Sequence, residues 1–316
     1  MMRLITASRN ALSMIAFTNC AISCTERTRE CKHEVMPQVR HSLTVRGRRL
    51  ARELRATREH ADLTLEQASA ALGWNRFKLG RIEAGKTRVS SPDVTRILDV
   101  YGVDPSVNAT LVQLARDASR RGWWNSYSGI YSGGYVGLED EASEIRTYHV
   151  QLIPGLLQTE DYARAVISAG VPDDQDEVNK RLHARMARKT LLSRPDAPVL
   201  NAVLAESALR QRVGGAAVMR DQLTALIKAA GRSNVAVRVL PYRAGARAGI
   251  EGSFVVLSFE DDLDPDIGYS EGIYGNVFIE GVEQVSHCRV EFDRIWEAAL
   301  SEEASERFIT DIASKF

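Results

Sequence analysis

One short stretch of the sequence concentrates side chains suited to contacting a polyanion. Residues 76–88 contain three arginines and two lysines: Arg76, Lys78, Arg81, Lys86 and Arg88. An arginine can donate two parallel hydrogen bonds to the O6 and N7 atoms of guanine, whereas a lysine offers a point charge suited to phosphate. The chemistry that this stretch supports is therefore noncovalent recognition of duplex DNA.

Sequence motifs of the common enzyme classes are absent. The chain has no glycine loop with a lysine for phosphate, no G-x-S-x-G and no H-E-x-x-H. His149, His183 and His287 are scattered, and a lone histidine is more often a packed or surface group than a catalyst. The acidic run of residues 260–266 lacks EF-hand spacing, so we interpret it as a solvated turn. We expect no catalytic residue, no cofactor and no metal ion.

Two short helices joined by a turn are predicted to present the basic stretch. Thr64 and Gln67 have the spacing of a capping box, in which the two side chains satisfy two backbone amides at a helix start. Gly73 accepts the left-handed backbone that ends a helix, and Asn75 can cap the next one. The inward side of the first helix consists of small and apolar residues: Leu65, Ala68, Ala71 and Leu72.

The second of these helices has an inward and an outward side. Helical spacing places Leu79 and Ile82 inward, and Gly85 ends the helix. An outward basic helix after a tight turn is typical of the unit that enters a major groove, although any solvated pair of helices can carry a basic face. Caps, turn spacing and charge agree over one window, which favours DNA binding through the outward residues Arg76, Phe77, Lys78 and Arg81.

Three further helices complete a small helical domain. The pattern predicts a helix over residues 47–61 before the pair, and two after it, over residues 91–101 and from residue 104 onward. Ser91 and Pro92 read as the N-cap and first residue of the middle one.

Residues 45–103 resemble the lambda-repressor/Cro-like (XRE-type) DNA-binding domain, most closely through the run RIEAGK from Arg81 to Lys86. The resemblance implies an ion pair between Arg58 and Glu83. The sequence departs from the family pattern at Leu65, where many members carry a phosphate-binding Gln. It departs again at Gly80, where Ser is common.

The same resemblance implies which residues meet DNA. Arg76, Phe77 and Arg81 would occupy base-reading positions, with Lys78, Lys86 and Arg88 near phosphates. Together with the helix caps, the predicted DNA-binding residues are Thr64, Gln67, Asn75, Arg76, Phe77, Lys78, Arg81, Lys86 and Arg88.

Length and charge indicate two domains with different partners. The chain has 316 residues and no net charge, yet residues 40–121 contain 16 Lys and Arg against 9 Asp and Glu, a net charge of +7. Residues 251–316 contain 4 against 16, a net charge of −12. This split suits a nucleic-acid-binding end joined to an acidic end. No run of about 18 apolar residues occurs, so we expect no membrane-spanning helix and no membrane partner.

The first segment, residues 1–39, is expected to be a disordered extension. Its apolar patch, residues 11–24, suggests a secretory signal, but secretion would remove a DNA-binding module from its target. We therefore interpret residues 1–35 as an upstream start assignment, with Met36 beginning the natural protein. The spacing of Cys20, Cys24 and Cys31 matches no familiar zinc pattern, and the few cysteines indicate a reducing cytoplasm.

Three segments follow the extension: a helix-turn-helix domain at residues 40–121, an aromatic and glycine-rich linker at 122–137, and an α+β domain at 138–316. We interpret the linker aromatics as anchors on the core of the second domain, with a docking surface as the alternative. The second domain is predicted to hold a mostly antiparallel sheet. Its strands are expected at residues 198–205, 234–240 and 253–259, with weaker candidates at 267–270 and 276–279. Helices are expected at residues 139–148, 159–169, 173–192, 216–230, 281–299 and 301–315.

The second half is similar to a domain found behind XRE-type helices in actinobacterial regulators. The similarity is carried by RTYHVQLIPGLLQTEDYARAVI, RQRVGGAAVMRDQL and EFDRIWEAALS. It implies an antitoxin-like transcriptional regulator associated with a small BldB-like partner protein.

Taken together, the sequence predicts a cytoplasmic, sequence-specific DNA-binding regulator. We expect a homodimer, because one recognition helix reads only a few base pairs and a second copy multiplies affinity and discrimination. The C-terminal domain would bind a small protein partner or an effector. The alternative is an antitoxin-like interaction protein whose DNA binding serves autoregulation, and an enzyme with a DNA-binding attachment is the third class considered.

Overall fold

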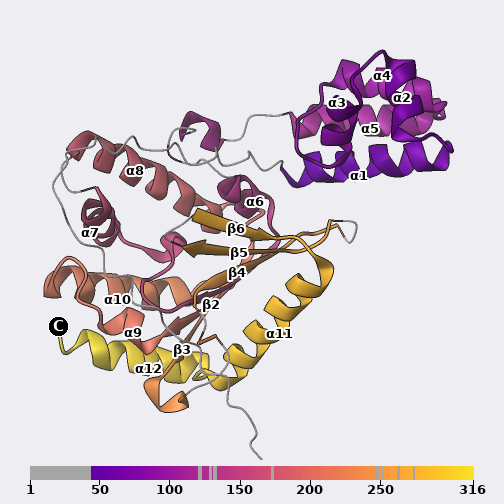
Figure 1. Cartoon of the computed structure of the whole chain (residues 1–316). Coiled ribbons are helices and arrows are strands. Elements are labelled where there is room, and N and C mark those ends of the chain that lie inside the picture. The colour runs from indigo at the N-terminus through magenta and orange to yellow at the C-terminus, as the bar shows by residue number, and fades with distance from the viewer. Residues whose placement is uncertain are drawn as a thin grey trace, which may run out of the picture. The chain divides into compact units, whose positions relative to one another are not determined.

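The computed structural model describes residues 44–119, 123–127, 130, 134–171, 174–245, 249–250, 252–261, 264–272 and 275–316. The predicted extension of residues 1–39, the start at Met36 and the cysteines Cys20, Cys24 and Cys31 lie outside the described residues. The chain is a helical N-terminal region followed by a domain of mixed sheet and helices (Figure 1), which confirms the predicted order of fold classes.

The N-terminal region contains the helices predicted from the sequence. They are α1 (Val45–His60), α2 (Leu65–Leu72), α3 (Arg76–Glu83), α4 (Ser91–Tyr101) and α5 (Pro105–Ala118). Their apolar faces enclose one core that includes Leu54, Leu72, Leu79 and Ile97, each fully buried. One boundary was predicted one residue late: the N-cap of α4 is Ser90, whose hydroxyl accepts from the Asp93 amide, so Ser91 is already helical.

The C-terminal domain contains six strands and its own helices. The strands are β1 (Glu144–His149), β2 (Val199–Ala205), β3 (Val235–Leu240), β4 (Phe254–Ser258), β5 (Ile267–Gly272) and β6 (Gly275–Ile279). The α-helices are α6 (Tyr135–Glu141), α7 (Glu160–Gly170), α8 (Gln175–Arg188), α9 (Glu206–Arg210), α10 (Ala216–Ala230), α11 (Val282–Ala298) and α12 (Glu302–Ala313). Two 3-10 turns, η2 (Gly155–Leu157) and η3 (Lys189–Ser193), also matter for the packing.

The sheet is mixed rather than dominated by one direction. Its strand order is β3-β2-β1-β4-β5-β6. β1, β2 and β3 pair in parallel, whereas β1 with β4, β4 with β5 and β5 with β6 pair antiparallel. The parallel pairs were not predicted, because β1 was assigned to a helix and the connection from β2 to β3 through α10 was not read as a parallel crossover.

β1 is the main error of the sequence prediction in this domain. Residues 139–148 were expected to be helical, but the helix α6 ends at Glu141 and Glu144–His149 is a strand. Burial within the strand follows the two-residue alternation of a sheet, with Ile145 and Thr147 on one face. Pairing on both sides, with β2 and β4, outweighs the helical spacing that suggested otherwise.

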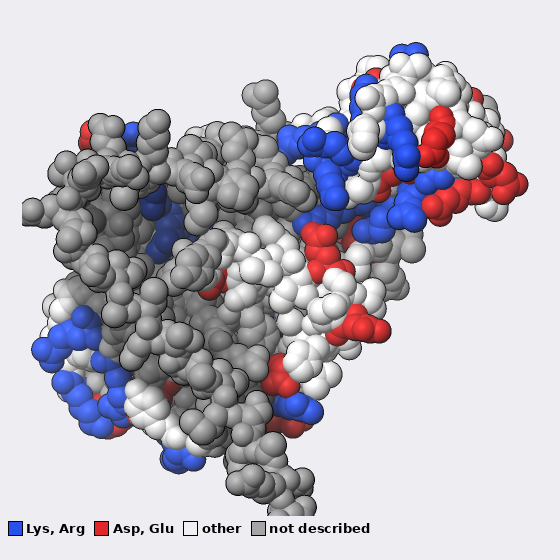
Figure 2. Space-filling model, viewed as in Figure 1, with Lys and Arg blue, Asp and Glu red and all other residues white. Residues whose placement is uncertain are grey.

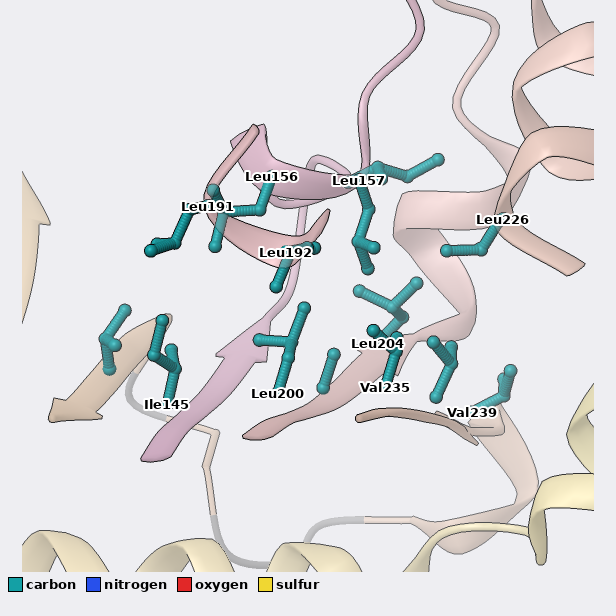
Figure 3. Packing of buried hydrophobic residues seen from close by; sticks show 14 of the residues in the cluster. Ile145, Leu156, Leu157, Leu191, Leu192, Leu200, Leu204, Leu226, Val235 and Val239 are labelled. Atoms are coloured by element: carbon teal, nitrogen blue, oxygen red, sulfur yellow. The ribbon is translucent and has the colours of Figure 1, made fainter. Parts of the chain in front are cut away.

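Helices and turns cover both faces of the sheet (Figure 1). On one face α11 packs Phe292 and Ile295 against Tyr148 and Val203. On the other, η2, η3, α10 and α12 cover the main core. Figure 3 shows the leucines of η2 and η3 above the strand residues Ile145, Leu200 and Leu204.

Aromatic residues from the predicted linker pack on the second domain. Tyr135 stacks on Tyr269 of β5 with ring centroids 4.1 Å apart, and Trp123 Nε1 donates a hydrogen bond of 3.0 Å to Asp140 Oδ1. A Cβ atom at Gly137 would lie 3.2 Å from the Trp124 ring, so this glycine admits the indole. These contacts agree with the anchoring interpretation of the linker, whose boundaries stay a prediction.

None of the helices in the described parts of the chain combines the length and apolar character needed to cross a membrane.

Candidate nucleic-acid interface

The turn between α2 and α3 is built by local capping. The Thr64 hydroxyl accepts from the Gln67 amide at 3.2 Å, and Gln67 Oε1 accepts from the Thr64 amide at 2.8 Å, so the predicted capping box is present. Gly73 ends α2 in the left-handed region, with φ of 65°. Asn75 Oδ1 accepts from the Phe77 amide at 2.8 Å and starts α3. The sequence thus dictates this turn through hydrogen bonds between near neighbours.

The helix α3 is buried on one side and open on the other. Leu79 and Ile82 are 0% and 2% exposed and belong to the core. Phe77 is 77% exposed, and the neighbouring Arg76, Lys78 and Arg81 are exposed as well. The Phe77 ring contributes little to the core and lies among exposed basic side chains, so this face of α3 combines apolar surface with positive charge.

The basic side chains of α3 are held by weak, exposed contacts. Arg76 Nε lies 2.9 Å from Glu66 Oε1 of α2, with both side chains more than half exposed. Arg81 Nε donates to Thr87 Oγ1 at 3.1 Å. Ion pairs in this setting contribute about 0 to 1 kcal/mol, so a stronger acceptor can replace them.

Lys78 is more engaged than its neighbours. Its Nζ atom lies 3.4 Å from the centroid of the Trp74 ring and 3.6 Å from Asp93 Oδ2. Reaching a phosphate would require Lys78 to leave both partners.

Trp74 was not among the predicted site residues. Its position in the turn, between the helix-ending glycine and the N-cap of α3, is the signal that could have drawn attention to it.

The remaining predicted site residues divide into two groups. Lys86 and Arg88 are exposed in the loop after α3, where a phosphate backbone could meet them. Thr64, Gln67 and Asn75 use their oxygens in the helix caps. Gln67 still carries two N–H donors that the capping box does not use. All nine predicted residues therefore lie on α2, α3 or the segments flanking them.

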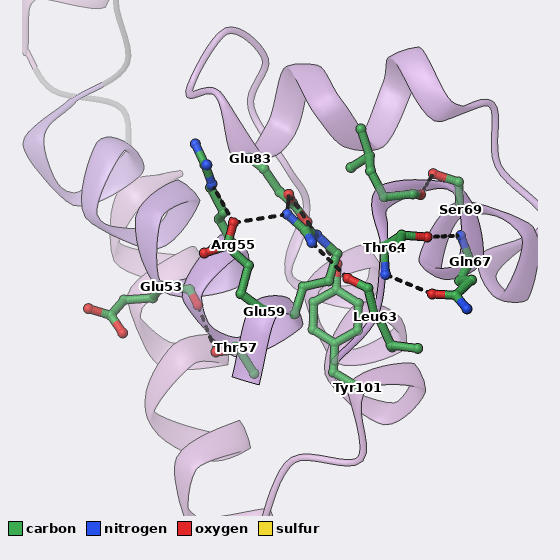
Figure 4. Close-up of polar contacts among 12 residues, drawn as sticks. Glu53, Arg55, Thr57, Glu59, Leu63, Thr64, Gln67, Ser69, Glu83 and Tyr101 are labelled. Carbon is green, nitrogen blue, oxygen red and sulfur yellow. Dashed lines mark hydrogen bonds and ion pairs between the residues drawn. The ribbon is translucent and has the colours of Figure 1, made fainter. Parts of the chain in front are cut away.

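A buried ion pair holds α3 against its neighbours, as the resemblance implied. Arg58 Nη2 of α1 donates to Glu83 Oε2 at 2.9 Å, and its Nε atom reaches both Glu83 oxygens. The Tyr101 hydroxyl of α4 donates to Glu83 Oε1 at 2.9 Å (Figure 4). Burial, followed by the charge of Glu83, raises the pKa of Tyr101, so its hydroxyl stays a donor. One carboxylate thus ties together α1, α3 and α4.

The two departures from the family pattern touch each other. A Cβ atom at Gly80 would lie 3.3 Å from Leu65 Cδ2, and Leu65 is partly buried against the core of this region. The glycine in α3 therefore leaves room for the leucine of α2, and apolar packing joins the two helices at this point.

Charge on this region is grouped rather than uniform. Figure 2 shows separate groups of basic and acidic side chains on the visible face of the helical region. Within the described residues no group of three or more His, Cys, Asp or Glu side chains is placed to hold a metal ion. His149, His183 and His287 lie on the separate elements β1, α8 and α11.

Capped α2 and α3, with the exposed face of the second, define the class of the N-terminal region: a helix-turn-helix DNA-binding domain. Residues 49–111 match the family described as "Helix-turn-helix domain". Residues 133–311 match "Domain of unknown function (DUF5753)", and because this match covers more than half of the chain, the protein belongs to that family. No curated protein and no solved structure matches the chain.

Proposed function

We propose that this protein is a sequence-specific, double-stranded-DNA-binding transcriptional regulator of the XRE type. The observation that carries the proposal is the exposed face of α3, where Phe77 is 77% exposed while Leu79 and Ile82 fix the opposite face in the core. The buried Arg58–Glu83 pair supports the same proposal because it holds the helix rigidly.

In this proposal α3 lies in the major groove. Arg76 and Arg81 exchange their exposed partners Glu66 and Thr87 for base edges, where each donates two hydrogen bonds to a guanine. Phe77 lies between them and contacts a thymine methyl group. Lys86 and Arg88 neutralise phosphates and set the register without reading sequence.

We also propose that the regulator acts as a homodimer in the cytoplasm, where its DNA lies. A single α3 reads too few base pairs for discrimination, and two copies on half-sites about 34 to 36 Å apart read twice as many. The target would then be a near-palindrome.

Replacing Arg81 tests the proposal. Arg81→Ala is expected to weaken binding to a selected DNA site by about 1 to 3 kcal/mol and to relax the preference at one base pair of each half-site. Fluorescence anisotropy with the full chain and a set of single-base variants of the site measures both effects. Arg55→Ala is the matched control, since Arg55 is an exposed arginine of α1 paired with Glu59. Unchanged affinity and base preference in Arg81→Ala would refute the assignment of α3.

For the C-terminal domain we propose that it receives a signal and catalyses no reaction. The small BldB-like partner and the antitoxin-like role implied by the family resemblance remain predictions. Co-purification of the intact protein from its own cells tests them, because a stoichiometric small protein would favour the interaction role over a small-molecule effector.

A further inference from the structure

The C-terminal domain contains a cavity that the DNA-binding proposal does not use. It measures about 370 Å³, within the range of small-molecule sites. Its described lining residues come from β1, β2, β4, β5, α6, α7, α8 and the segment around η2. None of these described residues belongs to the helix-turn-helix region.

One row of side chains on the sheet contributes to the lining of this cavity. Thr147 of β1 pairs with Ala202 of β2 and with Val255 of β4, and Val255 pairs with Tyr269 of β5. Cross-strand partners share a face, so these four side chains stand in one row. Three of the four, Thr147, Val255 and Tyr269, line the cavity.

Thr147 is a polar residue in an otherwise apolar part of this row. It is 2% exposed and lines the cavity. Among the described residues, its Oγ1 atom has no hydrogen-bond partner. An unpaired buried hydroxyl costs about 1 to 3 kcal/mol, and a valine would fill the same volume without that cost. The fold therefore retains a hydroxyl that it does not itself satisfy.

One wall of the cavity is aromatic. Tyr135 and Tyr269 are stacked with ring centroids 4.1 Å apart. Their hydroxyls are already used, since Tyr135 donates to Glu139 at 3.0 Å and Tyr269 donates to Glu271 at 2.8 Å. The rings add apolar surface to this wall of the cavity, while their polar ends are held by the protein.

Two arginines of α8 also line the cavity and are held in place by hydrogen bonds. Arg188 of α8 forms an ion pair with Glu139, whose side chain is 2% exposed. Arg185 donates to Gln158 Oε1 at 3.0 Å, and Gln158 Nε2 donates to the Ile153 carbonyl at 2.7 Å. These bonds anchor the segment around η2 to α8. Both guanidinium groups line the cavity and place positive charge on its wall.

His149 lies on the same face of β1, two residues beyond Thr147. Burial and the nearby charge of Arg188 lower the pKa of His149 to about 4, so its ring is neutral near pH 7. A neutral imidazole offers one donor and one acceptor. The cavity therefore combines apolar and aromatic surface with the unpaired Thr147 hydroxyl, two arginines and one neutral imidazole ring.

We propose that this cavity binds a small organic molecule with an apolar body and one carboxylate or amide group, the oxygen of which accepts from the Thr147 hydroxyl. The inference rests on the proposed function in one respect, since we proposed that this domain receives a signal. Occupancy of the cavity is a property of the C-terminal domain and is measured without DNA.

A panel of aromatic carboxylates and their primary amides tests the proposal on the full chain. Benzoate, cinnamate, indole-3-carboxylate and naphthalene-2-carboxylate, each with its amide, are titrated by calorimetry and saturation-transfer NMR. At least one member is expected to bind, and the carboxylate and amide arms show which group is preferred. Thr147→Val should weaken its binding about three- to tenfold, the loss of one hydrogen bond. The unliganded variant should be as stable as the parent protein or more so.

Two further variants keep the result interpretable. Val166→Phe places a ring at the α7 side of the cavity and should abolish binding. Thr224→Val makes the same threonine-to-valine change at an exposed position of α10 and should leave binding intact. If no panel member binds, or if Thr147→Val binds as tightly as Thr224→Val, the proposal is overturned. Loss of stability in Thr147→Val would also overturn it, because the hydroxyl would then have a structural role. DNA binding by Arg81→Ala is measured in a separate experiment, so a negative result for ligand binding in the cavity does not refute the DNA-binding proposal.

Discussion

At the scale of single residues, exposure separates the side chains that maintain the fold from those available to a partner. Leu79 and Glu83 of α3 are buried, whereas Phe77 is open to solvent. Helical spacing predicted that Leu79 faces the core and Phe77 the solvent, because inward positions recur every three or four residues. The ion pair of Glu83 was implied by the family resemblance. The contact of Lys78 with Trp74 was not predictable, since it depends on the rotamers of an exposed lysine and a partly buried tryptophan.

Lys86 provides a prediction about phosphate contacts. Lys86→Ala should weaken binding to all DNA sequences alike and reduce the slope of log affinity against log salt by about 1, because one phosphate contact releases about one counterion. Titrations at several salt concentrations with specific and unrelated DNA measure the slope. A change confined to one base pair would instead place Lys86 among the base-reading residues.

His149 provides a prediction about pH. Its pKa of about 4 in the folded chain lies below the ordinary value of 6.5, so the unfolded chain binds this proton more tightly. Stability should therefore decline as the pH falls from about 6.5 towards 4, by up to about 3 kcal/mol. His149→Gln should flatten this part of the pH profile in urea unfolding, whereas His287→Gln, on the exposed side of α11, should not. Identical profiles for both variants would show that His149 is not held neutral by the fold.

At the scale of elements, the helix caps were predicted correctly from the sequence, whereas the pairing of strands far apart in the chain was not. The caps at Thr64 and Asn75 and the glycine stop at Gly73 depend on neighbours a few residues apart, so the sequence contains the information needed. The strand β1 depends on β2, more than 50 residues away, and on β4. The cavity at Thr147 was missed for the same reason, because register decides which side chains share its row.

Glu83 provides a prediction about how elements are held together. Glu83→Ala leaves Arg58 and the Tyr101 hydroxyl without their buried acceptor, so unfolding of the helical region should become easier by about 3 to 5 kcal/mol. Far-UV circular dichroism during urea unfolding measures the loss. Glu59→Ala removes a half-exposed carboxylate paired with Arg55 and should destabilise the region much less than Glu83→Ala does. Equal losses in the two variants would contradict the role assigned to Glu83.

At the scale of the whole molecule, the chain joins a domain built to contact DNA to a domain with a cavity. The sequence alone predicted the two domains and their charge difference, +7 over residues 40–121 against −12 over residues 251–316. Homodimer formation and the effector depend on surfaces that no local pattern encodes, and they remain proposals. The central claim is that α3 enters the major groove and reads guanines through its arginines.

Methylation interference at guanine N7 tests that claim most directly, because N7 lies in the major groove at the atom that an arginine would contact. Methylating particular guanines of a selected site should block binding of the full chain. In Arg81→Ala the block should disappear at one guanine of each half-site and persist at the others. Binding that ignores N7 methylation, or an interference pattern unchanged in Arg81→Ala, would contradict the account.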